Sequence, residues 1–278
     1  RPFLSGSPPS RWKNQPMDQR FSRQLALTNF GETAQKNLAR SRVLVIGAGG
    51  VGSTVIPSLA AAGVGTVGVI DDDRVELSNL HRQHIHRLLD VGHKKVVSVV
   101  ERVADLSPAT TIVAIDSKLT PENALELFAG YDLIVDGSDN YATHYLAADA
   151  AEITGIPLVW GIACEFGAQA GVSWPARGAG FRDLHPLPPE TATIDTNVVC
   201  GIFPGAVSVV ASIVTSEAIK IAAQIGTTLL NRATNYDALT GEFSQQAYER
   251  AADAQPITAL ANYRHLFAYS PADEWPTG

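Results

Sequence analysis

The sequence predicts an α/β fold in which helices flank a mostly parallel β-sheet, with antiparallel strands added in the C-terminal half. Three observations lead to this prediction. Residues 42–46 form a short aliphatic run that stops at a glycine, as buried parallel strands do. A glycine-rich turn and a helical pattern follow this run. A second apolar run at 67–70 then ends at Asp71, which completes a strand-helix-strand order.

Composition and charge narrow the classes of function. The chain has 278 residues, enough to bury a sizeable core, and its net charge is -7. That charge argues against nucleic-acid binding, which needs a basic surface to neutralise phosphates. Cys164 and Cys200 are the two cysteines, too few for a disulfide framework or a four-cysteine metal site. We therefore expect no nucleic-acid partner and a reducing, cytoplasmic setting.

We expect neither a signal peptide nor a membrane span. Residues 1–19 are rich in proline and polar residues and have no apolar core, so they are interpreted as a flexible arm. The longest apolar stretch, 206–223, is interrupted by serine, threonine, glutamate and lysine, which favours a buried or interfacial helix. Between these stretches, helical patterns at 20–24 and 32–39 put Arg20 and Arg23 on nearly one face. From spacing alone, we interpret that face as a solvated basic surface.

The turn after the first strand has the pattern of a nucleotide site. Gly47, Gly49 and Gly52 match G-x-G-x-x-G, and Gly50 adds a further residue without a side chain. Such turns let backbone N–H groups approach phosphates at a helix N-terminus, where the macrodipole favours anions. The flanking strands and helix supply the context that this motif requires. Asp71, at the end of the second strand, is placed to accept hydrogen bonds from ribose hydroxyls.

The residues after the second strand argue against an NAD-dependent dehydrogenase, in which this segment is usually a variable loop. Here it carries Asp73 and the polar block Ser78-Asn79-Leu80-His81-Arg82-Gln83. Arginine is planar, permanently charged and bidentate, so Arg82 suits a phosphate chain. The histidines at 81, 84 and 86 do not share a helical face, and no cysteine or carboxylate pattern completes a metal site. We expect them to be surface or packing residues.

Two further charged groups are candidate ligands. Lys94 and Lys95 begin an amphipathic helix expected over 94–106. A cation at a helix N-terminus opposes the macrodipole, so at least one of them is a candidate phosphate ligand. A strand expected at 133–136 ends in Asp136-Gly137-Ser138-Asp139-Asn140, at the edge where open α/β sheets bind ligands. Asp139 suits Mg²⁺, whereas a purely structural role for Ser138, Asp139 or Asn140 is to cap the helix that begins near Tyr141.

The remaining elements extend the same layout. We expect strands at 111–115, 157–161, 169–174, 233–236 and 243–248, and a long helix at 203–223. The intervening stretch, 175–199, is rich in glycine and proline, and a loop of that length is usually functional or mobile. Residues 251–278 are expected to form a tail.

Taken in order, these motifs resemble those of the MoeB/ThiF (HesA/MoeB/ThiF) adenylyltransferases, bacterial relatives of the ubiquitin-activating enzymes. The resemblance also uses Arg20-Phe21-Ser22-Arg23-Gln24, Gly92-His93-Lys94-Lys95 and Glu217-Ala218-Ile219-Lys220. It covers residues 20–250 and implies a single Rossmann-like adenylation domain there, between the arm at 1–19 and the tail at 251–278.

The resemblance implies a reaction. ATP and Mg²⁺ would convert the C-terminal glycine carboxylate of a ubiquitin-like sulfur-carrier protein ending in Gly-Gly into an acyl-adenylate, with release of pyrophosphate. A carboxylate is a poor electrophile because its leaving group would be oxide, and AMP supplies a better one. The work of the enzyme is then mostly positioning and charge neutralisation. Carriers of the molybdopterin-synthase and thiamine types share this chemistry, and nothing in the sequence selects between them.

The resemblance also assigns roles to single residues. Gly49 would lie at the phosphate turn and Asp71 would bind ribose. Asn79, Arg82 and Lys95 would contact the phosphates. The full set expected to bind the cofactor is Gly47, Gly49, Gly50, Gly52, Asp71, Asp73, Ser78, Asn79, Arg82, Lys95, Asp139 and Asn140.

Three of the expected site residues are assigned to catalysis: Arg82, Asp139 and Arg23. By the resemblance, Asp139 binds the magnesium. Arg23 reaches the site of the other subunit of a homodimer, which would turn the basic face described above into part of a composite site.

The sequence departs from the family pattern in its cysteines. Many members hold a structural zinc through two C-x-x-C pairs, and the first pair lies where this chain has Gly180-Phe181-Arg182-Asp183. We therefore expect no zinc. The family often has a reactive cysteine in the crossover loop, where this chain has Asn197, with Cys200 three residues later. We expect Cys200 to be a buried or incidental thiol. The protein would then stop at adenylation and leave sulfur transfer to a separate sulfurtransferase.

Three other functions remain possible from the sequence. The same superfamily includes adenylating enzymes that modify peptides and a dehydratase that acts on tRNA, that is, on a tRNA-linked carboxylate. A non-catalytic nucleotide-binding scaffold is a second alternative, although it would not need Arg23, Arg82, Lys95 and Asp139. An NAD oxidoreductase is the third.

Overall fold

The computed structural model describes residues 17–186, 201–261 and 263. Its strands are β1 (Arg42–Ile46), β2 (Thr66–Ile70), β3 (Thr111–Ile115), β4 (Leu133–Asp136), β5 (Leu158–Cys164), β6 (Gly167–Ser173), β7 (Arg232–Asp237) and β8 (Glu242–Ala247). They form one sheet in the order β3-β2-β1-β4-β5-β6-β7-β8. The strands from β3 to β5 in this order are parallel, and the pairs β5–β6, β6–β7 and β7–β8 are antiparallel. The predicted fold class is confirmed.

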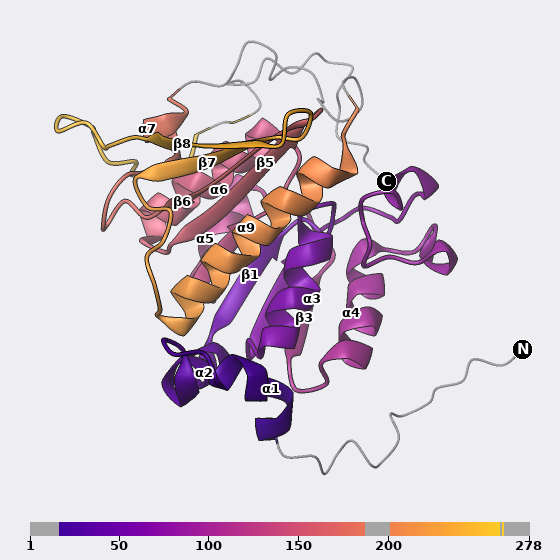
Figure 1. Cartoon of the computed structure of the whole chain (residues 1–278). Coiled ribbons are helices and arrows are strands. Elements are labelled where there is room, and N and C mark those ends of the chain that lie inside the picture. The colour runs from indigo at the N-terminus through magenta and orange to yellow at the C-terminus, as the bar shows by residue number, and fades with distance from the viewer. Residues whose placement is uncertain (1–16, 187–200, 262, 264–278) are drawn as a thin grey trace, which may run out of the picture.

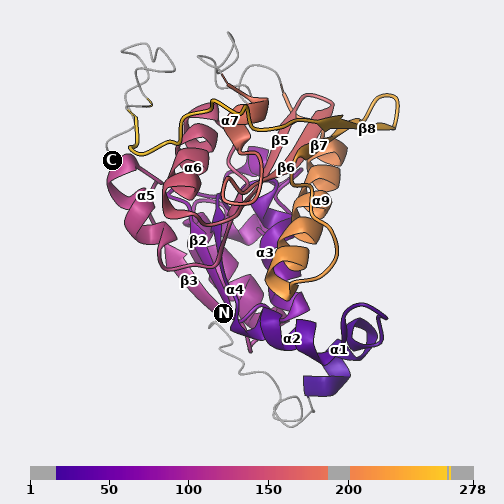
Figure 2. The ribbon, with the colours of Figure 1, turned by 90° about the vertical axis from the view of Figure 1, so that its left-hand side faces the viewer.

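Helices cover both faces of the sheet (Figure 1). They are α1 (Met17–Leu25), α2 (Gly31–Arg40), α3 (Gly52–Ala62), α4 (Lys95–Leu106), α5 (Pro121–Phe128), α6 (Tyr141–Thr154), α7 (Phe181–Leu184) and α9 (Pro204–Ala223), with short 3₁₀ segments at Leu77–Asn79 and Leu88–Asp90. Figure 2 shows α5, α6 and α7 on one side of the sheet and α3 and α9 on the other. α1 and α2 lie at the end of the sheet where β1 begins.

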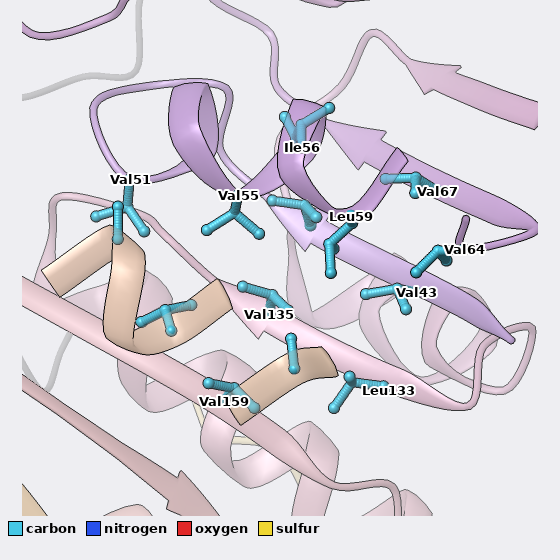
Figure 3. Packing of buried hydrophobic residues seen from close by; sticks show 14 of the residues in the cluster. Val43, Val51, Val55, Ile56, Leu59, Val64, Val67, Leu133, Val135 and Val159 are labelled. Atoms are coloured by element: carbon cyan, nitrogen blue, oxygen red, sulfur yellow. The ribbon is translucent and has the colours of Figure 1, made fainter. Parts of the chain in front are cut away.

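The core is divided between the two faces because successive strand residues point in opposite directions. On β1, Val43 and Val45 belong to the cluster beneath α3, α4 and α9, whereas Leu44 and Ile46 belong to the cluster beneath α5 and α6. Figure 3 shows the first cluster, in which α3 side chains such as Leu59 meet the sheet. Each fully buried aliphatic side chain contributes roughly 1.5–3 kcal/mol.

The helix expected at 203–223 is confirmed as α9, one residue shorter. By length and composition alone, α9 is long and apolar enough to cross a membrane. However, 56% of its most apolar stretch is buried inside the protein. Ala206, Val210 and Val214 are fully buried against the sheet and α3. The prediction of a buried helix is therefore confirmed.

The structure describes part of each predicted terminal segment. Residues 17–19, assigned to the arm, form the first turn of α1, and residues 1–16 lie outside the described part of the chain. Part of the predicted tail packs on α6: the backbone N–H of Ile257 donates to Glu152, and the Tyr263 hydroxyl donates to Asp149 at 2.6 Å. The sequence also missed α5 and α7, and it placed the start of α4 at Lys94, which is its N-cap.

Candidate active site

A pocket lies where the sheet reverses its strand order. β1 sits between β2 and β4, so the connections after β1 and after β4 leave from adjacent strand ends, the place where open α/β sheets bind ligands. The two turns are in contact, since a Cβ added to Gly47 would lie 3.1 Å from the Gly137 carbonyl oxygen. The predicted site residues that line this pocket are Gly47, Gly49, Gly50, Asp71, Asp73, Arg82, Lys95 and Asp139.

The glycine turn is fixed by backbone contacts that exclude side chains. Gly47 has a φ of +87°, and its N–H donates to Ile70 O at 2.9 Å. A Cβ on Gly52 would lie 2.0 Å from Gly47 O, and one on Gly50 would lie 2.6 Å from Val207. Gly52 therefore closes the turn from behind, while Gly50 lets α9 approach the pocket.

An acidic pair and a buried lysine form the second wall of the pocket. Lys95 is buried, with 5% of its surface exposed, and its ammonium lies 2.8 Å from the Asp73 carboxylate. Asp71 accepts hydrogen bonds from Ala48 N at 2.7 Å and Asp73 N at 2.8 Å. Burial raises the pKa of Asp71, although Lys95 acts against this. Burial opposes the charge of Lys95, but the carboxylates of Asp71 and Asp73 outweigh it and raise the pKa of Lys95. The lysine is therefore held as a cation beside the glycine turn.

The polar block after β2 supplies a cation and a buried amide. The Arg82 guanidinium donates to the His81 ring at 2.8 Å. Partial burial, and then the charge of Arg82, lower the pKa of His81, which keeps the ring able to accept. Gln83 is 3% exposed and lines the pocket, and its Oε1 has no hydrogen-bond partner within the described residues. A buried amide oxygen without a partner is costly, so it marks a place where a ligand or water donates.

A buried acid-histidine pair holds the turn that carries Asp139. Asp136 is fully buried, and its carboxylate lies 2.7 Å from His144 Nδ1. Ser138 donates to Asp136 through both its N–H and its hydroxyl, at 3.0 and 2.7 Å. Burial alone would raise the pKa of Asp136, but the His144 charge and these hydrogen bonds together lower it. Asp139 follows directly, lines the pocket, and its charge helps to raise the pKa of Lys95.

Other predicted ligands are not part of the lining. Asn79 is buried and accepts from Glu76 N at 3.1 Å, and Ser78 is exposed and donates to the Glu76 carboxylate. Asn140 accepts from Thr143 N at 2.9 Å and so caps α6, which is the structural role that the sequence left open. The binding roles of Ser78, Asn79 and Asn140 stay predictions.

Within one subunit, Arg23 lies at the end of the molecule opposite the pocket. Its neighbour Gln24 donates to Ala62 O at the last residue of α3, while the pocket is at the first. A helix of 11 residues is about 16 Å long. Arg23 is therefore not brought to the pocket of the chain that carries it.

The sequence did not assign seven of the lining residues to the site: Val51, Gln83, Gly137, Ser138, Ala163, Ile202 and Val207. Gln83 is the last residue of the polar block that begins at Ser78, so its place in that block was a signal for the site. Ile202 and Val207 reach the pocket from the region around the start of α9, far away in sequence, and no local pattern marks them. Gly137 and Ser138 belong to the cluster named at the end of β4.

The histidines of the polar block are surface or packing residues, as predicted. His86 is 6% exposed and hydrogen-bonded within the protein, while His81 and His84 are exposed. In the described part of the chain, no group of three or more histidine, cysteine, aspartate or glutamate side chains is placed to hold a metal. The absence of zinc stays a prediction, and Cys200 and Asn197 lie outside the described residues.

The strand order and the glycine turn at its reversal point are those of Rossmann-like α/β proteins. The chain belongs to the ThiF family, whose model matches residues 21–256. This confirms the family resemblance.

Relatives from three organisms are similar over most of this chain. The probable adenylyltransferase/sulfurtransferase MoeZ of Mycobacterium tuberculosis is 42% identical over 251 residues, which are 89% of this chain and 64% of MoeZ. The sulfur carrier protein adenylyltransferase of Thermus thermophilus is 40% identical over 86% of this chain and 90% of its own length. The SAMP-activating enzyme E1 of Haloferax volcanii is 38% identical over 84% and 86% of the two chains.

Solved structures agree on the fold. A crystal structure of E. coli MccB with AMPCPP and MccA matches with a TM-score of 0.77 and 19% identity, covering 89% of this chain and 76% of that one. At this identity the match concerns the fold alone.

Proposed function

We propose that this protein is an ATP-dependent adenylyltransferase that activates the C-terminal glycine carboxylate of a ubiquitin-like sulfur-carrier protein as an acyl-adenylate. The observation that carries the proposal is the set of charged side chains that two connections, after β2 and after β4, bring to one glycine turn: Lys95, Arg82, Asp73 and Asp139. A redox cofactor would not need this set. The names of the relatives from Thermus thermophilus and Haloferax volcanii describe the same kind of activity for those proteins.

The proposed chemistry uses the pocket for charge neutralisation. A carboxylate oxygen of the carrier attacks the α-phosphorus of ATP, and the bond to the bridging oxygen breaks so that pyrophosphate leaves with its electron pair. Negative charge grows on the phosphate oxygens, where Arg82 and Lys95 would stabilise it. Lys95 is suited to this because Asp71 and Asp73 hold it in place and keep it protonated. Asp71 keeps lone pairs free for ribose hydroxyls.

The residues present fit a magnesium ion that is shared with the nucleotide. Asp139 and Asp73 line the same pocket, and Mg²⁺ is usually held by one or two carboxylates together with waters and substrate phosphates. We assign Asp139 as the protein ligand. The ion would supply charge neutralisation at the phosphates and would orient them.

The proposal includes a homodimer in which Arg23 completes the pocket of the partner subunit. In one subunit, α1 lies far from the pocket, which supports a role for Arg23 in the pocket of the other subunit. We also propose that a separate sulfurtransferase acts on the adenylate, that no nucleic acid or membrane takes part, and that the protein works in the cytoplasm.

The test is ATP–pyrophosphate exchange with candidate carrier proteins ending in Gly-Gly. Wild type should exchange only when a carrier is present, and Arg82→Ala and Asp139→Ala should each lose at least about 100-fold, as expected for groups that stabilise developing charge. Arg177→Ala is the matched control, because Arg177 stacks on Trp174 at the opposite end of the molecule.

Unchanged exchange in both site variants would refute the site assignment. Exchange that needs no carrier would refute the proposed substrate. Exchange that a peptide or a tRNA-linked carboxylate supports in place of the carrier would favour an enzyme that acts on that substrate.

A further inference from the structure

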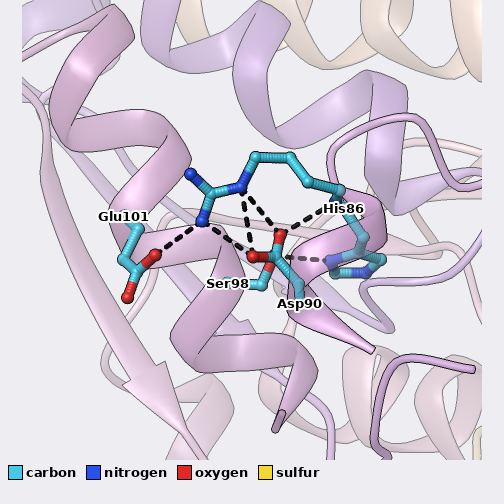
Figure 4. Close-up of polar contacts among 5 residues, drawn as sticks. His86, Asp90, Ser98 and Glu101 are labelled. Carbon is cyan, nitrogen blue, oxygen red and sulfur yellow. Dashed lines mark hydrogen bonds and ion pairs between the residues drawn. The ribbon is translucent and has the colours of Figure 1, made fainter. Parts of the chain in front are cut away.

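A chain of polar contacts joins α4 to the glycine turn, and Figure 4 shows its members from Glu101 to His86. At its outer end, Arg87 lies 2.7 Å from both Glu101 and Asp90. The Ser98 hydroxyl donates to Asp90 at 2.8 Å and lies 2.9 Å from His86 Nδ1. The turn is reached at the inner end, where His86 Nε2 lies 3.0 Å from the carbonyl oxygen of Ala48, a residue that Figure 4 does not draw.

The inner members of this chain are buried, so their contacts are not replaced by water. His86, Asp90 and Ser98 are 6%, 1% and 2% exposed. Burial would raise the pKa of Asp90, but the hydrogen bonds from Arg87 outweigh burial and lower the pKa to about 2. Asp90 is therefore a fixed carboxylate that orients Ser98, and Ser98 in turn orients the His86 ring.

The contact with Ala48 requires a proton on Nε2 of His86. A carbonyl oxygen only accepts, so Nε2 must donate to it. Ser98 has one hydroxyl proton, so while it donates to Asp90 its oxygen can only accept from Nδ1, which then carries a second proton. The Ala48 N–H is also engaged, because it donates to Asp71 at 2.7 Å. Both polar groups of Ala48 are therefore held by side chains, one on each side of the turn.

This arrangement determines the direction of the next amide. In a trans peptide unit the Ala48 carbonyl and the Gly49 N–H lie in one plane and point in opposite directions. With the Ala48 oxygen aimed at His86, the Gly49 N–H points away from His86. Gly49 lines the pocket, and the N–H groups of such turns are those that bind phosphate oxygens.

We propose that His86 is a positioning residue for phosphate binding: its Nε2–H holds the Ala48 carbonyl so that the Gly49 N–H is presented to the nucleotide. Ser98, Asp90, Arg87 and Glu101 keep the His86 ring in the required orientation. The inference rests on the proposed function only in taking a nucleoside triphosphate as the ligand.

The test compares ATP with adenosine, which lacks phosphates, by isothermal titration calorimetry on the full chain. His86→Phe keeps a ring of similar size but removes both hydrogen bonds, and it should weaken ATP binding about tenfold while leaving adenosine binding within about twofold. His86→Gln keeps an amide donor for the Ala48 carbonyl and should regain most of the ATP affinity. His93→Phe changes an exposed histidine of the same loop and should bind both ligands like wild type.

Two results would overturn the inference: ATP affinity unchanged in His86→Phe, or equal losses for ATP and adenosine, which indicate general damage to the fold. If His86→Phe does not fold, Ser98→Ala removes the contact at Nδ1 and should also weaken ATP binding more than adenosine binding, by a smaller factor. Unchanged ATP binding in Ser98→Ala would then overturn the inference. Exchange assays separate the two proposals. A wild type that binds ATP but catalyses no exchange would refute the proposed function, while the binding comparison would still decide the role of His86.

Discussion

Acid should destabilise the folded protein through His185. Burial, and then the charge of His144, lower the pKa of the His185 ring from 6.5 to about 4. Its Nε2 lies 2.8 Å from Gln169 Oε1, and its ring packs on Phe181 and Trp160. Because the unfolded chain binds the proton more readily than the folded protein, lowering the pH through 6.5 favours unfolding. The loss in unfolding free energy should reach roughly 2 kcal/mol at pH 5 and roughly 3 kcal/mol below pH 4.

Urea denaturation of wild type and His185→Asn between pH 8 and pH 5 measures this effect. At pH 8 the difference between the two proteins reports only the packing and the hydrogen bond of the ring. As the pH falls, wild type should lose stability faster than the variant, and the difference should change by about 2 kcal/mol. Parallel curves down to pH 5 would show that the His185 pKa is not lowered and would refute the reasoning.

Three further predictions concern single side chains. Gly52→Ala places a Cβ 2.0 Å from Gly47 O, so the turn must move and ATP affinity, measured by calorimetry, should fall at least about tenfold; an unchanged affinity would contradict the role of the turn. Leu38→Ala empties a fully buried position on α2 and should cost roughly 2–5 kcal/mol in urea unfolding without changing ATP affinity. Asp149→Asn removes the charge that holds Arg182 at 2.6 Å and should cost roughly 3–5 kcal/mol. Adding Arg182→Met should recover part of that loss, and a double variant as unstable as the single one would argue against a stranded charge.

Most of the parallel half of the fold was predictable because β1, β2 and β4 are buried and therefore appear as continuous aliphatic runs, whereas β3 is a largely exposed edge strand. The strands β1, β2, β3 and β4 were placed to within one residue. α5 also had a local signal that was not used, since Thr120 and Asn123 form a capping box around Pro121. Strand order was not predictable in this way, because it depends on which faces pack together.

The site was predictable where chemistry and backbone share a motif. The glycine turn and Asp71 are fixed by one strand-turn-helix-strand unit, Asp139 follows the end of β4, and Lys95 is a cation at the start of a helix. Asn79 shows the limit of this approach, because its side chain caps a 3₁₀ turn that no periodicity predicts. The contact between Tyr263 and Asp149 joins residues far apart in sequence, so it was invisible to a local pattern.

The pocket lining runs from Gly47 to Val207 and draws on the ends of β1, β2, β4 and β5 and on the start of α9. A nucleotide bound there would fasten together segments that the chain itself connects only through long detours, much as a cross-link does. Ligand and fold would then stabilise each other: at 100 times its dissociation constant a nucleotide would add about 2.7 kcal/mol to the free energy of unfolding. The melting temperature would therefore report nucleotide binding even where no carrier protein is at hand.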